Sequence, residues 1–315
     1  MASIGGAQVS AQGFGAMGLS HVYGQADEAQ SIATLHRAIE LGINFFDTAT
    51  AYGSGHNEEL LGRAIAGRRD GLVLASKFTH QRSDGSRVTA REAVEASLGR
   101  LAVERIDLYY LHRVDPQVPV EESVGALRVL QDEGKIGGIG LSEVSAEQLR
   151  SAYAVAPIAA LQSEYSLWTR GVEAEILPTA RELGIAFVAY SPLGRGFLAG
   201  AGPVEENDRR NIHPRFQAEA VAANTRRRRA IEDVAERLRV SPAQVSLAWV
   251  LAKGVVPIPG TRHIRHLEDN WAAGALQLDE GTIEELEAAF PHGATVGDRY
   301  PAEQMQSVPA DAVPA

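Results

Sequence analysis

Short apolar runs alternate with amphipathic stretches along most of the chain. The runs are nearly continuous in apolar residues, which is typical of strands that are covered on both faces. Between them, apolar residues recur at helical spacing, as at Ile32, Leu35 and Ile39. The pattern predicts strands at residues 14–19, 43–47, 72–76, 106–111, 136–141, 158–162, 185–190 and 255–259. It predicts helices at residues 28–41, 57–68, 90–101, 120–133, 146–154, 172–183, 226–238 and 242–252.

The order of these elements predicts an α/β fold. Strands that alternate with helices are parallel and are joined by right-handed crossovers. Eight strands favour a closed (β/α)8 TIM barrel over an open doubly wound sheet, because nothing marks a second half or a linker. We expect a single domain over residues 1–315, with an N-terminal cap at 4–12 and C-terminal closing helices at 265–273 and 281–289. The small, Pro-rich residues 301–315 are expected to form a flexible tail.

Charge and composition narrow the functional classes. A net charge of −10 and a pI near 5.4 are the reverse of a nucleic-acid footprint. The basic run at 226–229 is followed by acids, as on a solvated helix face. The chain has no cysteine, which excludes disulfides and thiolate chemistry. No signal peptide or membrane-length apolar run is visible, so we expect a cytoplasmic protein with no membrane partner; no pattern indicates an oligomeric state.

The stretch FFDTATAYGSGHNEELLG brings an acid and a phenol to the end of the second predicted strand, at Asp47 and Tyr52. The next two strands end in Lys77 and His112. Each residue alone has an ordinary structural explanation, such as a cap or a satisfied backbone group. Because barrel strands end at one rim, we expect the four to meet there.

Together these residues suit protonation of an oxyanion. A cationic Lys77 beside the phenol is expected to lower the pKa of Tyr52 from about 10 toward neutral. Asp47 would hold Lys77 in place, Tyr52 would donate a proton, and a neutral His112 would orient the same substrate oxygen. A metal site is a weak interpretation because a third ligand is missing. Since no side chain donates hydride, the chemistry implies a nicotinamide cofactor.

Three glycine-containing segments are candidates for holding that cofactor. GFGAMG (13–18) matches a dinucleotide fingerprint, but neither a helix nor a suitably spaced acid follows, so its glycines more simply allow close backbone approach. YSPLGRG (190–196) offers an aromatic ring and a Gly-Arg-Gly turn. IPGTRHIRHLEDN (258–270) offers a helix start with Arg262, Arg265 and His266, which favours NADPH over NADH. An ordinary helix start with surface arginines remains the alternative there.

The motifs FGAMGLS, DTATAYG, YYLHR, GKIGGIGLSEVS, LQSEYSLW, YSPLGRG, IPGTR and GDRYP resemble the aldo-keto reductase superfamily, in its bacterial and plant-like branch. The resemblance covers nearly the whole chain. It implies an eight-stranded barrel, NADPH bound without a Rossmann fold, and a catalytic tetrad of Asp47, Tyr52, Lys77 and His112. It also implies cofactor contacts from Ser142, Glu143, Gln162, Tyr190, Ser191, Leu193, Gly194, Arg195, Gly260, Thr261, Arg262, His266, Asp269 and Asn270.

Two positions depart from that family's pattern. Glu143 stands where many members carry Asn, which puts its contact with the carboxamide in doubt. His266 stands where Arg is common near the 2′-phosphate, so NADH use stays open. The substrate pocket is expected to be walled by Tyr23, Phe78, Arg113 and Trp168, with ordinary packing of the aromatic residues as the alternative.

These observations predict reversible, NADPH-dependent reduction of aldehydes or ketones, with the proton supplied by Tyr52. Two alternatives remain open. The same barrel holding NADPH with little turnover would act as a regulatory or sensor module. A barrel isomerase or lyase would instead use Lys77 to form a Schiff base.

Overall fold

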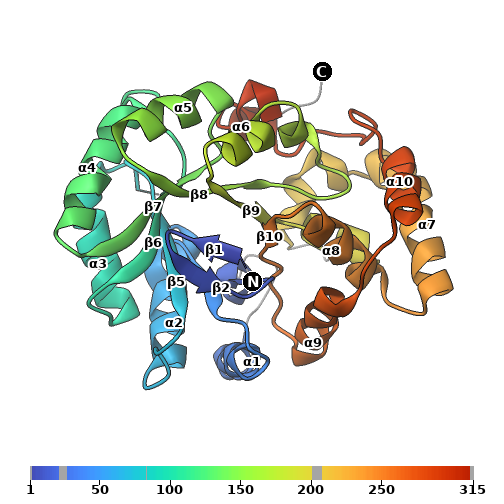
Figure 1. Ribbon diagram of the computed structural model, residues 1–315, viewed down its shortest axis with the longest axis horizontal. Coiled ribbons are helices and arrows are strands. Elements are labelled where there is room, and N and C mark those ends of the chain that lie inside the picture. Colours follow the sequence, from blue (N-terminus) through green and yellow to red (C-terminus); the bar gives the residue numbers. More distant parts are fainter. Residues whose placement is uncertain (1, 21–26, 83, 201–207, 313–315) are drawn as a thin grey trace.

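Eight parallel strands form one strongly curved sheet in the computed structural model, which describes residues 2–20, 27–82, 84–200 and 208–312. Each strand pairs with the next one in the sequence, in the order β3 to β10 (Figure 1). The strands are β3 (Phe14–Gly15), β4 (Phe45–Asp47), β5 (Val73–Phe78), β6 (Ile106–Leu111), β7 (Ile136–Ser142), β8 (Ile158–Glu164), β9 (Ala186–Tyr190) and β10 (Val256–Pro257). The predicted (β/α)8 barrel is confirmed.

The first and last strands meet through close backbone contacts. The Gly13 amide donates to the carbonyl of Pro257 at 2.9 Å. A Cβ atom at Gly260 would lie 2.1 Å from the Gly15 carbonyl oxygen, so only glycine fits there. The fingerprint-like glycines therefore serve the approach of two backbones, as expected, and β3 continues into a short 3-10 turn (Ala16–Leu19) instead of a phosphate-binding helix.

Helices surround the sheet on its outer side (Figure 1). They are α1 (Glu28–Glu40), α2 (His56–Ile65), α3 (Ala90–Leu101), α4 (Val120–Asp132), α5 (Ala146–Val155), α6 (Ile176–Glu182), α7 (Ala218–Leu238), α8 (Pro242–Ala252), α9 (Ile264–Ala272), α10 (Glu280–Ala289) and α11 (Ala302–Met305). Most lie within a few residues of the predicted ranges. The start of α7 was predicted eight residues too late, because the Ala-rich stretch 218–225 carries no strong amphipathic signal but has high helix propensity.

The basic run at 226–229 lies on α7, and two of its arginines form hydrogen bonds or ion pairs within the protein. Arg227 donates to the carbonyls of Ala289 and Ala294, and Arg228 pairs with Glu232. The two contacts of Arg227 tie α7 to the end of α10 and to the loop that follows it, whereas the Arg228–Glu232 pair lies within α7. None of the described helices is both long and apolar enough to cross a membrane.

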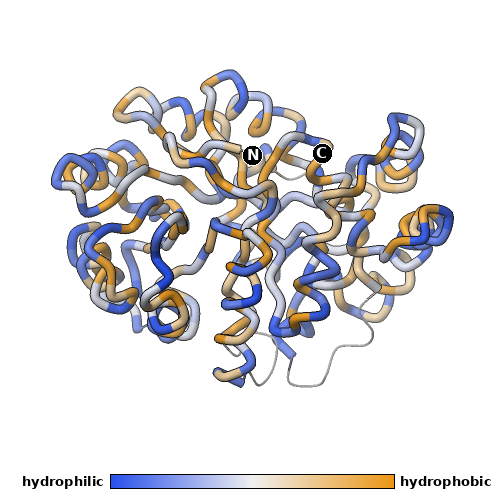
Figure 2. Tube along the Cα trace, turned by 60° about the horizontal axis from the view of Figure 1, so that its bottom comes forward, coloured by the Kyte–Doolittle hydropathy of each residue, from blue (hydrophilic) through white to orange (hydrophobic). Residues whose placement is uncertain are grey.

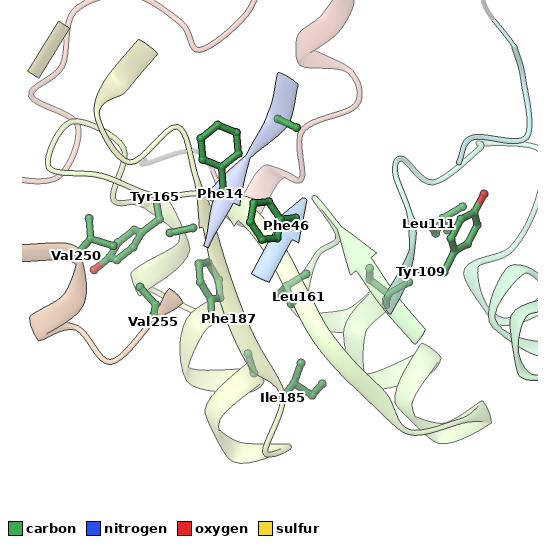
Figure 3. Packing of buried hydrophobic residues seen from close by; sticks show 14 of the residues in the cluster. Phe14, Phe46, Tyr109, Leu111, Leu161, Tyr165, Ile185, Phe187, Val250 and Val255 are labelled. Atoms are coloured by element: carbon green, nitrogen blue, oxygen red, sulfur yellow. The ribbon is translucent and has the colours of Figure 1, made fainter. Parts of the chain in front are cut away.

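Two hydrophobic clusters hold the layers together. The larger one fills the space between the strands and the helices, where Phe14 and Phe46 from neighbouring strands lie 6.1 Å apart (Figure 3). The helices present apolar residues to this layer, and Figure 2 shows apolar and polar positions alternating along them. The smaller cluster lies inside the barrel and includes Phe45, Leu108 and Tyr110.

Both ends of the chain pack against the barrel. The antiparallel hairpin β1 (Ala2–Ile4) and β2 (Ala7–Val9) lies across the ring of strands in Figure 1 and adds Ile4 and Val9 to the inner cluster. Within the predicted flexible tail, Val308 and Ala312 are buried, and the Asp311 carboxylate accepts a hydrogen bond from the Ala146 amide. Residues 308–312 therefore pack against the barrel at the start of α5, while residues 302–304, 306 and 307 are exposed. Residues 313–315 lie outside the described part, and the flexible tail stays a prediction.

Candidate active site

Alternation along the strands places the polar strand-end residues inside the barrel. Asp47 is the last residue of β4 and is the register partner of Ala75 on β5. Lys77 follows Ala75 by two residues and is the last residue but one of β5. Since side chains two apart share a face of a strand, Lys77 points inward with Asp47. The Lys77 ammonium forms an ion pair with Asp47 Oδ1 and donates to the Thr48 carbonyl at 2.9 Å. Both side chains are buried, with 0% and 2% of their surface exposed.

Tyr52 and His112 lie beside this ion pair. Tyr52 begins a short 3-10 turn (Tyr52–Gly55) in which Gly53 and Gly55 adopt positive φ angles. The turn brings the Tyr52 hydroxyl to 3.5 Å from Lys77 Nζ, and the ammonium lies 5.2 Å from the centre of the phenol ring. The His112 ring meets the Tyr52 ring edge to face, with centroids 5.9 Å apart. The structure thus brings together all four residues of the predicted tetrad.

The electrostatics of the tetrad differ from the prediction in one respect. Burial, followed by the Asp47 carboxylate, raises the pKa of Tyr52 well above its ordinary value, so the expected fall toward neutral is wrong for the protein without a bound cofactor. The carboxylate of Asp47 disfavours a second negative charge at the phenol, and burial also lowers the pKa of Lys77 itself. Tyr52 therefore keeps its proton at neutral pH, which is the state a proton donor needs.

His112 is neutral, as the sequence predicted. Burial, assisted by the nearby cations of Arg113 and Lys77, lowers the pKa of His112 well below its ordinary value. The His112 amide also donates to the Phe78 carbonyl at 2.7 Å, which fixes the backbone at the end of β6. A neutral imidazole in this place can donate or accept one hydrogen bond to an oxygen near Tyr52.

A cavity of about 780 Å³ opens beside the tetrad. Asp47 and Tyr52 form part of its wall, and the loops after β9 and β10 contribute much of the remainder. The predicted cofactor residues that line it are Gln162, Tyr190, Ser191, Leu193, Arg195, Gly260, Thr261, Arg262, His266, Asp269 and Asn270. A ligand that carries both a flat ring and anionic groups fits this lining, because the wall includes a tyrosine ring and several arginines.

Three predicted cofactor residues are not among the described residues that line the cavity. Ser142 accepts a hydrogen bond from Arg113 Nη1 at 3.1 Å. The Glu143 carboxylate accepts from the Glu164 amide at 2.9 Å and from Arg299 at 2.6 Å, so its charge is directed to an arginine of the chain. Gly194 packs on Trp168, where a Cβ atom would come within 2.6 Å of the indole.

The Asp269 carboxylate has a structural contact in addition to its place in the wall. It accepts hydrogen bonds from Ser241 Oγ at 2.7 Å and from Gln244 Nε2 at 3.0 Å. Ser241 is the N-cap of α8 and Gln244 completes its capping box. Asp269 therefore fixes the start of α8 against α9, and this contact occupies both of its carboxylate oxygens.

Two members of the predicted substrate pocket are core residues instead. Phe78 is buried and stacks on Tyr109, with centroids 5.8 Å apart. Trp168 is buried and stacks on Phe197 at 4.5 Å. Neither is among the described residues of this cavity wall, and Trp168 lines a separate, smaller cavity near Arg299. These contacts favour the packing alternative, and a role of either residue at a substrate stays a prediction.

The other two members have different outcomes. Arg113 follows His112 and donates through Nη1 to the His112 carbonyl at 2.7 Å and to Ser142 at 3.1 Å. It therefore lies beside the tetrad, between the ends of β6 and β7. Tyr23 lies outside the described residues.

Several residues of the site were not predicted. Gly15, Met17, Gly18, Arg210 and Ser241 contribute to the cavity wall. The GFGAMG motif was assigned to backbone packing alone, although strand-end position would have placed Met17 and Gly18 near the rim. Arg210 comes from a segment without a motif, and the Ser-Pro-Ala-Gln start of α8 indicates a helix cap and not a cavity wall. No cluster of three or more potential metal ligands occurs in the described parts of the chain.

Fold and site together define a TIM-barrel enzyme with an Asp–Tyr–Lys–His constellation at the carboxyl ends of its strands. The model of the aldo/keto reductase family matches residues 12–290. The chain belongs to this family of oxidoreductases, which act on carbonyl compounds.

Individual relatives agree with this assignment. A probable aldo-keto reductase 1 of Glycine max is 46% identical over 309 residues, covering 94% of this chain and 89% of the relative. The glycerol dehydrogenase structure from Gluconobacter oxydans is 29% identical with a TM-score of 0.79, covering 90% of this chain and 93% of that one. An aldo-keto reductase from Klebsiella pneumoniae in complex with NADPH is 29% identical with a TM-score of 0.75, covering 95% and 99%.

Proposed function

We propose that this protein is an NADP-dependent carbonyl reductase that converts aldehydes or ketones reversibly to alcohols. The observation that carries the proposal is the position of the Tyr52 hydroxyl, 3.5 Å from Lys77 Nζ, in the wall of a cavity that cations and a tyrosine ring also line. A solved relative from Klebsiella pneumoniae is a complex with NADPH, which supports the choice of cofactor.

The cavity lining supports a division of the cofactor site into two ends. Gln162, which donates to Asp47, and Tyr190 line the same cavity as Tyr52, and a nicotinamide ring would stack on Tyr190 and be oriented by Gln162. Arg195 and Arg262 also line the cavity and offer positive charge to the pyrophosphate and the 2′-phosphate, and His266 offers a hydrogen-bonding ring nitrogen. A nicotinamide bound in this pose supplies or accepts the hydride at the carbonyl carbon.

The residues of the chain manage the proton. Tyr52 retains its proton at neutral pH and donates it to the carbonyl oxygen as negative charge develops there, because an alkoxide is a stronger base than a phenolate. Lys77 then stabilises the phenolate that remains, at a distance of 3.5 Å. The neutral His112 directs the carbonyl oxygen toward Tyr52. In the reverse direction Tyr52 accepts the proton of the alcohol.

The Schiff-base alternative is disfavoured by the contacts of Lys77. Its nitrogen is buried and surrounded by three oxygen acceptors, those of Asp47, Thr48 and Tyr52. A nucleophilic amine needs a free lone pair that points at the substrate, and this nitrogen directs its N–H bonds to fixed partners. Borohydride treatment with a carbonyl substrate is therefore expected to leave Lys77 unmodified.

The test is the loss of NADPH absorbance with a panel of aldehydes, ketones and sugars. Tyr52→Phe is expected to lower kcat by roughly 10²- to 10⁴-fold, the usual contribution of general acid catalysis. The NADPH affinity of this variant should stay within about twofold, because a phenyl ring keeps the shape of the wall. Tight NADPH binding by the wild type without turnover on any substrate would contradict the proposal and favour the regulatory module.

A further inference from the structure

The segment that follows α10 returns to the cavity at Tyr190. The hydroxyl groups of Tyr190 and Tyr300 lie 2.8 Å apart and share a hydrogen bond. Arg299 Nη2 donates to the same Tyr190 hydroxyl at 3.0 Å. Because Tyr190 ends β9 and lines the cavity, two residues more than a hundred positions later in the chain fix the polar end of its ring.

Arg299 also connects the two strands before β9. It is 2% exposed, its Nη2 lies 2.6 Å from Glu143 Oε1, and its Nε lies 3.4 Å from Glu164 Oε2. Glu143 follows β7 and Glu164 ends β8. One guanidinium therefore contacts residues at the ends of β7, β8 and β9, the three strands that carry Ser142, Gln162 and Tyr190.

The charges around Arg299 explain why a carboxylate is tolerated at position 143. A buried carboxylate is costly unless a cation and hydrogen bonds compensate it. Glu143 receives Arg299, and Glu164 is shared by Arg195 and Arg215, each at 3.3 Å. The negative charge of Glu143 is therefore compensated by Arg299 of the same chain.

The ring of Tyr300, whose hydroxyl contacts Tyr190, is itself packed against three side chains. The guanidinium carbons of Arg195 and Arg299 lie 5.0 Å and 5.7 Å from the centre of its ring. His213 packs against the same ring, with centroids 5.6 Å apart, and its Nδ1 lies 3.2 Å from the Arg299 carbonyl oxygen. These contacts hold the ring of Tyr300, and its hydroxyl lies 2.8 Å from the Tyr190 hydroxyl.

We propose that Arg299 and Tyr300 are positioning residues for the nicotinamide end of the cofactor site: they hold the Tyr190 ring in the stacking position and neutralise Glu143 behind it. This proposal rests on the proposed function, since it assigns Tyr190 to the nicotinamide. It predicts a local effect, confined to the nicotinamide end. A role in folding alone would weaken both ends of the site together.

The test compares two ligands by equilibrium binding, NADPH and adenosine 2′,5′-bisphosphate, which contains the adenosine end but no nicotinamide. Arg299→Met is expected to raise the Kd for NADPH roughly tenfold and to leave the Kd for the bisphosphate within about twofold. Tyr300→Phe removes only the shared hydroxyl bond and is expected to raise the NADPH Kd about threefold. Arg299→Lys, which keeps the charge, should recover part of the NADPH affinity.

Arg170→Met is the matched control. Arg170 is a buried arginine that pairs with Glu173, which follows β8, and with Glu287 on α10. This control should lower the thermal midpoint of unfolding without changing the ratio of the two dissociation constants. If Arg299→Met and Tyr300→Phe leave that ratio unchanged, or raise both constants equally, the proposal is overturned.

The experiment also distinguishes a variant that does not fold from a failure of the proposed function. Should Arg299→Met fail to fold, Tyr300→Phe and Arg299→Lys give the decision, because both preserve most of the buried volume. Should the wild type bind the bisphosphate but not NADPH, the proposed function fails as well. Wild-type NADPH binding with an unchanged ratio in the variants overturns the positioning role alone.

Discussion

Gln162 donates a hydrogen bond of 2.8 Å to Asp47 Oδ2, the carboxylate oxygen that does not pair with Lys77. The two oxygens of Asp47 thus have one fixed partner each, one from β5 and one from β8. Gln162, which is proposed to orient the nicotinamide, therefore also holds the acid of the tetrad.

Gln162→Met is expected to lower both stability and turnover. The substitution removes a hydrogen bond to a buried carboxylate, which costs about 2 kcal/mol of unfolding free energy. It should also lower kcat, because Asp47 and then Lys77 lose a fixed position. Gln131→Met is the control, since Gln131 donates at 2.8 Å to the Gly137 carbonyl, far from the tetrad. Denaturant titration and initial rates measure the two effects; an equal loss of kcat in the control would refute the link.

The pH dependence of turnover follows from the raised pKa of Tyr52 and the lowered pKa of His112. A raised pKa keeps the phenol protonated, and a lowered one keeps the imidazole neutral. Carbonyl reduction should therefore stay within about twofold between about pH 6 and about pH 9, while alcohol oxidation, which needs the phenolate, should rise with pH. Single-turnover rates in both directions check this. A reduction rate that falls above neutral pH would restore the original expectation of an acidified phenol.

His213 makes the fold sensitive to mild acid. Burial, with the nearby Arg195 cation, lowers the pKa of His213 to about 4. The unfolded chain binds this proton near pH 6.5 and the folded chain near pH 4, so unfolding becomes easier as the pH falls through that window. Between about pH 7 and about pH 5, we expect a loss of about 2 kcal/mol from this residue. The side chain of His213→Phe cannot titrate, so its free energy of unfolding should fall by about 2 kcal/mol less than that of the wild type over this pH range. Denaturant titrations at both pH values measure this, and an equal fall in the two proteins would contradict the assignment.

Two glycines provide a matched pair of packing predictions. A methyl group at Gly140 on β7 would lie 2.3 Å from the Tyr110 ring inside the barrel, so Gly140→Ala should destabilise the protein by roughly 1–3 kcal/mol or more. Gly125 lies on α4 with open space around it, so Gly125→Ala should stabilise it by up to ~1 kcal/mol. Thermal unfolding of both variants is the measurement. Equal effects of the same sign would show that the inner cluster can rearrange around the added methyl.

The linear sequence determined the barrel and the four residues of the tetrad. Strand and helix periods are local properties, and parallel strands bring their carboxyl ends to one rim. Asp47, Lys77 and His112 could therefore be placed together from their positions at strand ends alone. The start of α7 was missed because its first turns carry propensity without a periodic pattern.

Only the tertiary structure decided which way a side chain turns and what compensates each buried charge. Phe78 and Trp168 are buried, and the Glu143 carboxylate accepts a hydrogen bond from Arg299. Burial and the Asp47 carboxylate raise the pKa of Tyr52. These outcomes depend on contacts between residues far apart in the chain and on desolvation, neither of which has a signature in local spacing. A residue's type and strand position are written in the sequence, whereas its electrostatic environment exists only when the strands have closed around it.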